Sequence, residues 1–253
     1  WLWGRNIWNY CNRVSGFATK ARYSASRAVL IAEGVGDANT LFNTLVEYGL
    51  CLEITGDYAI SDSKDSPYSI YHRVKGIAGD CSHADAVIYA NLRLAECLLT
   101  YGRYDEVRPL MTEVLNAKLE YPRRREDCIE GLKLLATACL GQEDLQGAEQ
   151  AISDAFGLYD TSIGGWHKAW LDYYSAMLWI KKKAFDRAEV DFNKALDQWG
   201  RLGHSDCWFG HLGLACIHGE RGDWQSMSRG LQALSTLVQE YNLGYALALV
   251  SLH

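Results

Sequence analysis

Histidine and cysteine side chains recur near the end of the sequence at spacings that could hold a metal ion. His204, Cys207, His211 and His218 stand at i, i+3, i+7 and i+14, which on a helix places them on one face. Zinc binds imidazole and thiolate groups, so His204, Cys207 and His211 form a candidate zinc site. Four-coordinate sites usually have tighter paired spacings, however. We therefore favour packing of His211 and His218 against a neighbouring helix, and we expect no metal and no cofactor.

No other arrangement of residues indicates catalysis. The sequence contains no Gly-x-x-x-x-Gly-Lys phosphate loop, no Gly-x-Ser-x-Gly nucleophile elbow and no His-Glu-x-x-His zinc motif. Gly34 and Gly36 do not follow a strand-like segment, so they predict a turn between helices. We therefore expect that the protein is not an enzyme.

Charge and hydropathy limit the classes of partner. The formal net charge is −6, whereas proteins that bind nucleic acids normally carry a basic face. The basic runs 123–125 and 181–183 are expected to be solvated, at a helix start and in a turn. No segment is apolar for the ~18 residues that a membrane span needs, and none resembles a signal peptide. We expect a cytoplasmic protein without direct nucleic-acid or membrane contact. Free thiols are expected within apolar helical stripes at Cys51, Cys97, Cys139 and Cys216.

A small residue nine places before a turn returns five times along the chain. The small residues are Gly49, Ala95, Ala136, Ala176 and Ala215, and the turn residues are Tyr58, Tyr104, Leu145, Phe185 and Trp224. Successive turns are about 40 residues apart, so one supersecondary unit is repeated. Repeat arrays present long surfaces and seldom carry chemistry, so the pattern favours a binding scaffold over an enzyme.

Within each unit the apolar spacing predicts two antiparallel helices. Apolar residues of segment 84–99 fall three and four positions apart, at Val87, Ala90, Leu94 and Leu98. This spacing places one apolar stripe on a helix. Gly102 ends that helix, and a second one is expected from Tyr104, with Pro109 in its first turns. In the unit at Tyr58, residues 61–65 are poor helix formers, so its second helix is expected to begin late, near Pro67.

This pattern resembles the tetratricopeptide repeat family. The shared features are the small residue, an aromatic turn position with Gly two before it, Ala three after it, and a large apolar residue seven after it. The resemblance is best in 84–117, 126–159 and 168–200, whereas the last unit has Met227 where Ala is expected. The repeat length is similar to that of longer-helix members, as in kinesin light chains and in the superhelical sensor regions of large bacterial transcription activators and signal-transduction NTPases.

The resemblance implies an all-α solenoid of five to six helix-turn-helix repeats that form a right-handed superhelix. We expect one solenoid domain over residues 1–253. Its units are expected at about 1–36, 37–82, 83–123, 124–164, 165–203 and 204–241, with the start of a further helix at 242–253. The front unit would pair a helix over 1–14 with one over 17–33.

In tetratricopeptide arrays the first helix of each pair lines a concave groove. Carried over to this sequence, the groove positions predict a partner-binding surface made by Tyr89, Leu92, Glu96, Lys133, Trp170, Tyr173, Met177 and Phe209. The last four would form an apolar patch that anchors a partner peptide, since aromatics supply large contact area and Met adapts its shape. A carboxylate clamp is only partly matched: Arg93 fits, but Glu47 stands where Asn is expected and would repel a carboxylate.

The resemblance thus implies a protein–protein interaction scaffold that binds a peptide or helix of a partner in its groove. The alternative is a sensor region of a multidomain transcription regulator or signal-transduction NTPase. The groove could instead be filled by a further helix of the same polypeptide. The sequence lacks an initiator Met and opens on Trp1-Leu2-Trp3. We therefore expect other domains of the polypeptide at one or both ends, or self-association there.

Overall fold

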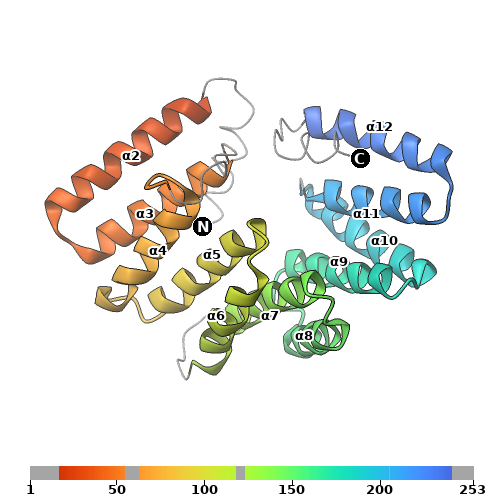
Figure 1. Cartoon of the computed structure of the whole chain (residues 1–253), viewed down its shortest axis with the longest axis horizontal. Helices are drawn as coiled ribbons and strands as arrows, with labels where there is room; N and C mark the ends of the chain where they lie inside the picture. The colour runs from red at the N-terminus through yellow and green to blue at the C-terminus, as the bar shows by residue number, and fades with distance from the viewer. Residues whose placement is uncertain (1–16, 55–62, 118–122, 205, 241–253) are drawn as a thin grey trace.

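The computed structural model describes residues 17–54, 63–117, 123–204 and 206–240. In these ranges every regular element is helical: α2 (Phe17–Val35), α3 (Ala38–Ile54), α4 (Pro67–Ile77), the short 3-10 helix η1 (Ala78–Asp80), α5 (Ala86–Thr100), α6 (Tyr104–Asn116), α7 (Arg124–Gly141), α8 (Leu145–Leu158), α9 (Gly165–Lys181), α10 (Phe185–Leu202), α11 (Cys207–Glu220) and α12 (Trp224–Glu240). Consecutive helices pack together and follow an open arc (Figure 1). The predicted all-α solenoid is confirmed, and its right-handed winding stays a prediction. The helices expected at 1–14 and 242–253, and the turn at Tyr58, lie outside the described residues.

The turn inside four of the helix pairs is the same hydrogen-bonded motif. In each, the residue two places before the second helix has a left-handed backbone: Gly102 (φ 69°), Glu143 (φ 61°), Lys183 (φ 57°) and Gly222 (φ 75°). The N–H of the next residue donates to a carbonyl five residues earlier, as Ala184 does to Trp179 at 2.8 Å. This is the Schellman closure of a helix C-terminus. It reverses the chain in the same way in each of these pairs.

The repeated small residues lie at helix interfaces, as predicted. Ala95, Ala136 and Ala176 are fully buried and Ala215 is 1% exposed. A Cβ added to Gly49 of α3 would lie 2.7 Å from the ring of Tyr71 on α4, far inside van der Waals contact. The small side chain is therefore what allows the two helices of this pair to approach each other.

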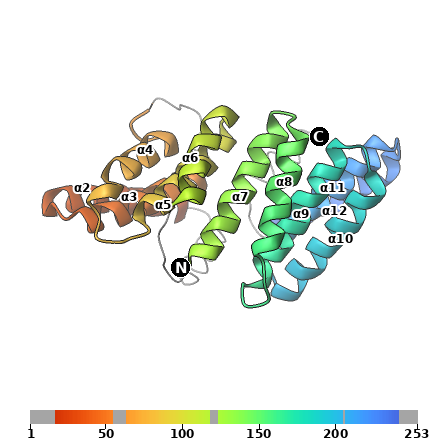
Figure 2. The same ribbon diagram turned by 90° about the horizontal axis from the view of Figure 1, so that it is seen from below.

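First and second helices of the pairs form different layers. The first helices α5, α7 and α9 contact one another in sequence and α9 also contacts α11, whereas the second helices mainly contact the first helices before and after them. Figure 1 shows α5, α7 and α9 on the inner side of the arc, with α6 and α8 outside. In the view from below, α7, α8 and α9 run side by side (Figure 2). Residues that link α5, α7, α9 and α11 therefore lie in the inner layer.

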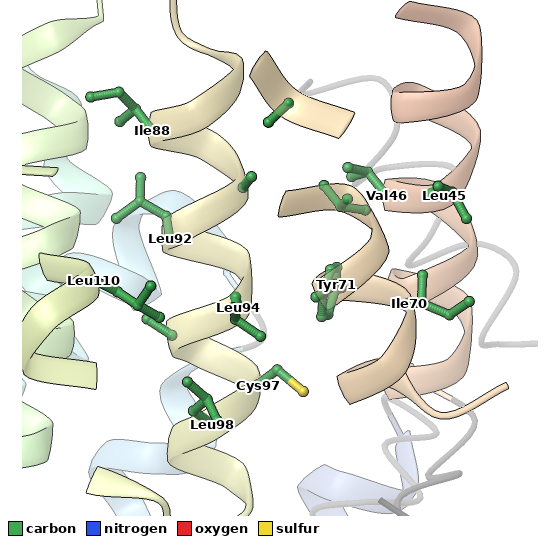
Figure 3. Close-up of a cluster of buried hydrophobic side chains, with 14 of the residues drawn as sticks. Leu45, Val46, Ile70, Tyr71, Ile88, Leu92, Leu94, Cys97, Leu98 and Leu110 are labelled. Carbon is green, nitrogen blue, oxygen red and sulfur yellow. The ribbon is translucent and has the colours of Figure 1, made fainter. Parts of the chain in front are cut away.

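The largest buried cluster joins α3, α4 and α5. Figure 3 shows Tyr71 on the side of α4 that faces α5 and Ile70 on the side that faces α3, and Cys97 of α5 points toward α4, while Ile88 and Leu92 point to the other side of α5. Tyr71 and Cys97 are fully buried and Leu92 is 5% exposed. The helix α5 is thus apolar on two sides, because it packs against α4 of the preceding unit on one side and against α6 and α7 on the other.

Several smaller expectations can be compared with the structure. The late start of α4 is confirmed: it begins at Pro67, after Ser66, whose Oγ accepts the N–H of Ser69 at 3.1 Å as an N-cap. Val87 of the predicted apolar stripe is 43% exposed, and Cys216, also placed in an apolar stripe, is exposed as well. Cys81, Cys97, Cys128, Cys139 and Cys216 are free thiols. Among the described helices, none is long and apolar enough to cross a membrane.

Candidate functional site

An aromatic cluster joins α9 to α11 in the inner layer. It consists of Trp166, Trp170, Tyr173 and Tyr174 on α9, Trp199 on α10 and Phe209 on α11. The ring centroid of Trp170 lies 5.3 Å from Tyr173, 5.0 Å from Phe209 and 5.3 Å from Trp199, each pair close to edge-to-face. Such contacts add to the apolar burial of the rings. Trp199 is fully buried, whereas Trp170, Tyr173 and Phe209 are half-buried. The cluster therefore has a buried base and partly open rings above it.

A carboxylate fixes the edges of the two indoles. The Nε1–H groups of Trp166 and Trp170 both donate to Oδ2 of Asp206 at 3.1 Å. The side chain of Asp206 is 14% exposed, and Nδ1 of His204 lies 3.2 Å from the same oxygen. Asp206 immediately precedes α11, so these bonds tie the start of α11 to the first half of α9. Charged acceptors strengthen such hydrogen bonds, which fixes the orientation of both indoles.

A buried ammonium lies over the faces of the same indoles. The Nζ atom of Lys133 on α7 is 4.7 Å from the ring centroid of Trp166 and 5.6 Å from that of Trp170. It also donates to Oε2 of Glu130 at 2.6 Å, and its side chain is only 2% exposed. Burial raises the pKa of the Glu130 carboxyl and the Lys133 charge lowers it, with a net lowering. A buried charge needs such partners, and Lys133 has a carboxylate and two ring faces.

His167, which lies beside Lys133 and Glu130, is held in its neutral form. Burial, followed by the charge of Lys133, lowers the pKa of His167 to about 4. The imidazole is therefore uncharged near neutral pH. It packs against Trp166, with ring centroids 4.9 Å apart.

At the other end of the inner layer, one guanidinium forms ion pairs with two carboxylates. Nη2 of Arg93 on α5 lies 3.2 Å from Oε2 of Glu53 on α3 and 2.9 Å from Oε2 of Glu96. The hydroxyl of Tyr71 donates to Glu53 at 3.0 Å. The side chains of Arg93 and Glu53 are 12% and 14% exposed, and that of Glu96 is 49% exposed. Only Glu96 among these charged groups is open to solvent.

Desolvation dominates the titration of Glu53. Burial raises its pKa, the charge of Arg93 lowers it, the charge of Glu96 raises it and the Tyr71 hydrogen bond lowers it, with a net pKa of about 7. The raised value means that Glu53 binds a proton more readily than an exposed glutamate does. Arg93 is already shared between two carboxylates, so it is not available to clamp the carboxylate of a ligand.

The predicted groove residues are only partly accessible. Glu96 is exposed, and Tyr89, Trp170, Tyr173, Met177 and Phe209 are half-buried. Two residues do not lie on the surface: Leu92 is 5% exposed and Lys133 is 3% exposed. The expectation that these two contact a partner is wrong, because first helices pack directly on one another. A Cβ added to Gly131 of α7 would lie 3.7 Å from Leu92, so Leu92 fills the contact between α5 and α7.

The candidate zinc ligands are not brought together. His204 precedes α11 and does not share a helical face with Cys207 and His211. His211 is exposed, so its expected packing against a neighbouring helix is also wrong. Over the described ranges, no group of three or more His, Cys, Asp or Glu side chains is arranged to hold a metal ion.

Sequence reasoning missed several members of the site, among them Trp166, Asp206 and Glu53. Trp166 lies four residues before Trp170, one helical turn away on the same face, and this spacing was a usable signal. Asp206 lies outside any helix, and Glu53 lies at the end of α3. The indole partners of Asp206 and the guanidinium partner of Glu53 can be seen only in the tertiary structure.

No protein-family model and no curated protein matches the sequence. Among solved structures, the chain is similar to BtubC (BKLC) from P. vanneervenii. The sequence identity is 17% and the TM-score is 0.61, with 89% of this chain and 92% of that chain covered. At this identity the likeness shows a shared fold.

Proposed function

We propose that this protein is an interaction scaffold whose inner face binds a peptide or helix of a partner protein. The aromatic cluster on α9 and α11 is the main contact, and Glu96 on α5 marks the other end of the surface. The proposal includes the tetratricopeptide type of repeat and a cytoplasmic location.

One observation carries the proposal: the half-buried rings of Trp170, Tyr173 and Phe209 stand together on a rigid base. Trp199 supports them from below, and Asp206 fixes the Trp170 indole. Residues that dominate protein interfaces are commonly aromatic side chains held in place before binding. These rings offer a large apolar area that loses little conformational freedom when a partner docks.

The same packing decides which experiment is informative. Replacing Trp170 and Tyr173 with Ala would remove partner contacts, but it would also leave a cavity above Trp199 and destabilise α9 and α10. A change that retains bulk at the surface is therefore preferable to truncation.

Site-specific photo-cross-linking meets this requirement. p-Benzoylphenylalanine would be placed at Glu96 or Phe209 on the inner face, or at Val190 on α10, which is 54% exposed. The protein would be irradiated in cells that naturally make it, and the cross-linked peptides identified by mass spectrometry. We expect both inner positions to capture segments of the same partner, and the Val190 control not to capture it.

Two results would contradict the proposal. Equal capture at Val190 and at the inner positions would show that the inner face is not selective. Cross-links from Glu96 and Phe209 only to this same chain would show that the face is covered from within.

A further inference from the structure

We propose that the segment bound by the inner face is cationic, with Lys or Arg side chains beside apolar ones. This inference rests on the proposed function, and it adds the chemistry of the partner. An apolar side chain of the segment would contact the aromatic cluster. Its positive charges would lie near Asp206 and near Glu96.

The balance of charge on the inner face supports a positive ligand. Four acidic side chains line it, of which Glu53 is only partly ionised near neutral pH, whereas two permanently charged cations lie among them. The carboxylates belong to Glu53, Glu96, Glu130 and Asp206, and the cations to Arg93 and Lys133. At the start of α7, Arg123 and Glu126 pair with each other and add no net charge. His204 beside Asp206 adds a positive charge only when it is protonated.

The two cations are already engaged inside the protein. Lys133 is buried between Glu130 and the indoles, and Arg93 is shared by Glu53 and Glu96. The half-exposed Glu96 carboxylate shares its counter-ion with a second acid, so the field outside it is negative. A ligand side chain that approaches this end therefore meets a carboxylate and no accessible cation, which favours a positive group.

The aromatic cluster binds a cation in the structure itself. The ammonium of Lys133 lies over the faces of Trp166 and Trp170, at 4.7 and 5.6 Å from the ring centroids. The electron-rich faces of aromatic rings attract a positive charge, most strongly where water is excluded. Tyr173 and Phe209 extend this cluster toward the partly open side, with ring centroids 5.7 Å apart. A guanidinium or ammonium of a partner would find the same kind of surface there, with Asp206 beside it.

An acidic segment does not fit this face. Its carboxylates would approach Glu96 and Asp206, and neither Arg93 nor Lys133 could pair with them without leaving a buried acid unpaired. Like charges brought together at an interface oppose binding. The same reasoning opposes the phosphates of a nucleic acid.

Selection from a displayed library of random 12-residue peptides tests the inference directly. The immobilised full chain would be the target, and enriched peptides would be sequenced. We expect enrichment of Lys and Arg next to Leu, Ile, Phe or Trp. Enrichment of acidic peptides that compete for the inner face would overturn the cationic inference and leave the scaffold proposal standing. Failure to enrich any peptide would contradict the scaffold proposal itself.

Charge-neutral variants then locate the contact. The double variant Glu96→Gln, Asp206→Asn removes two negative charges but keeps an oxygen acceptor for the Trp166 and Trp170 N–H groups. Its matched control is Glu149→Gln, Asp197→Asn, which removes two exposed charges from α8 and α10. For an enriched peptide measured by fluorescence anisotropy, we expect the first variant to weaken affinity by about tenfold. The control should change it by less than about twofold.

The fold of each variant would be checked by its thermal unfolding midpoint, so that lost binding is not confused with lost structure. The wild-type affinity should also fall as salt rises from ~0.05 to ~0.5 M, because salt screens charge attraction. Equal affinity of the two double variants for the same peptide would overturn the assignment of the charge contact to Glu96 and Asp206.

Discussion

Buried charged side chains are held in the inner layer by short polar contacts. Lys133 meets Glu130 at 2.6 Å, and Arg93 lies between Glu53 and Glu96. A charge taken out of water is costly unless it is paired and hydrogen-bonded. The Arg93–Glu53 pair therefore fixes the register of α3 on α5, and Lys133 over the Trp166 and Trp170 rings fixes that of α7 on α9, more strictly than apolar packing alone would.

Glu53 makes stability depend on pH. Its pKa is raised from 4.5 in the unfolded chain to about 7 in the folded one. The folded protein therefore binds more protons than the unfolded chain between these values, and this contribution to stability is lost as pH rises from about 4.5 through 7. We expect the free energy of unfolding of Glu53→Gln, which cannot ionise, to rise relative to wild type by about 1–3 kcal/mol between pH 5 and pH 8. Urea unfolding at several pH values measures it.

A second substitution checks that the effect belongs to this contact. Tyr71→Phe removes the hydroxyl that donates to Glu53 at 3.0 Å and that lowers its pKa. The pH range over which stability is lost should then move upward. Parallel curves for wild type and Glu53→Gln would show that this carboxyl does not titrate differently on folding.

At the scale of elements, the turn between paired helices decides where the chain reverses. Glu143 and Lys183 adopt φ of 61° and 57° there, where Gly102 and Gly222 occupy the same place in other units. A left-handed backbone costs a non-glycine residue about 1–2 kcal/mol. The Schellman hydrogen bonds are evidently sufficient to hold it.

Exchanging the residue types at this position should change stability in opposite directions. Lys183 is exposed, so we expect Lys183→Gly to stabilise the protein by about 0.5–1 kcal/mol and Gly102→Ala to destabilise it by about 1 kcal/mol. The matched control is Gly200→Ala on α10, where φ is not positive and no atom lies within 4 Å of the added Cβ. That change should stabilise α10 by about 0.5–1 kcal/mol. Destabilisation by Lys183→Gly in urea unfolding would contradict this account of the turn.

These elements also show what the sequence could predict. The small residue nine before each turn identified the helix pairs, because close packing restricts that position to Gly or Ala. It could not show that Leu92 and Lys133 are buried, since a groove position and a contact between neighbouring first helices share the same helical face. The Asp206 contact joins α9 to a residue about 40 positions away, a distance at which single-sequence periodicity carries no information.

At the scale of the whole molecule, the end helices have fewer neighbours than the central ones. In α2 the described side chains are buried only at Val29 and Ala32, whereas Leu30 and Ile31 are 58% and 64% exposed. In α12 the only described buried side chain is Leu234. Central α7 is buried at Ile129, Leu132, Ala136 and further positions.

This difference predicts a gradient of local stability. Each unit of a repeat array depends on its neighbours, so the ends open at lower free energy than the centre. We expect backbone amides of α7 and α9 to exchange with deuterium at least tenfold more slowly than those of α2 and α12. Mass spectrometry of peptic fragments after timed labelling measures these rates. Uniform protection from α2 to α12 would indicate a single cooperative unit instead.

The two layers of helices also determine how the arc bends. First helices touch along the inner side, and ion pairs such as Lys75–Glu113 and Arg108–Asp144 link successive second helices or their starts on the outer side. In mechanical terms, the contacts between successive first helices act as hinges in series. Their compliances add, so small rotations accumulate between α2 and α12. A bound segment that contacts only α9 and α11 braces one hinge, whereas one that reaches Glu96 on α5 braces three. The length of the bound segment would then set how much of the arc is stiffened.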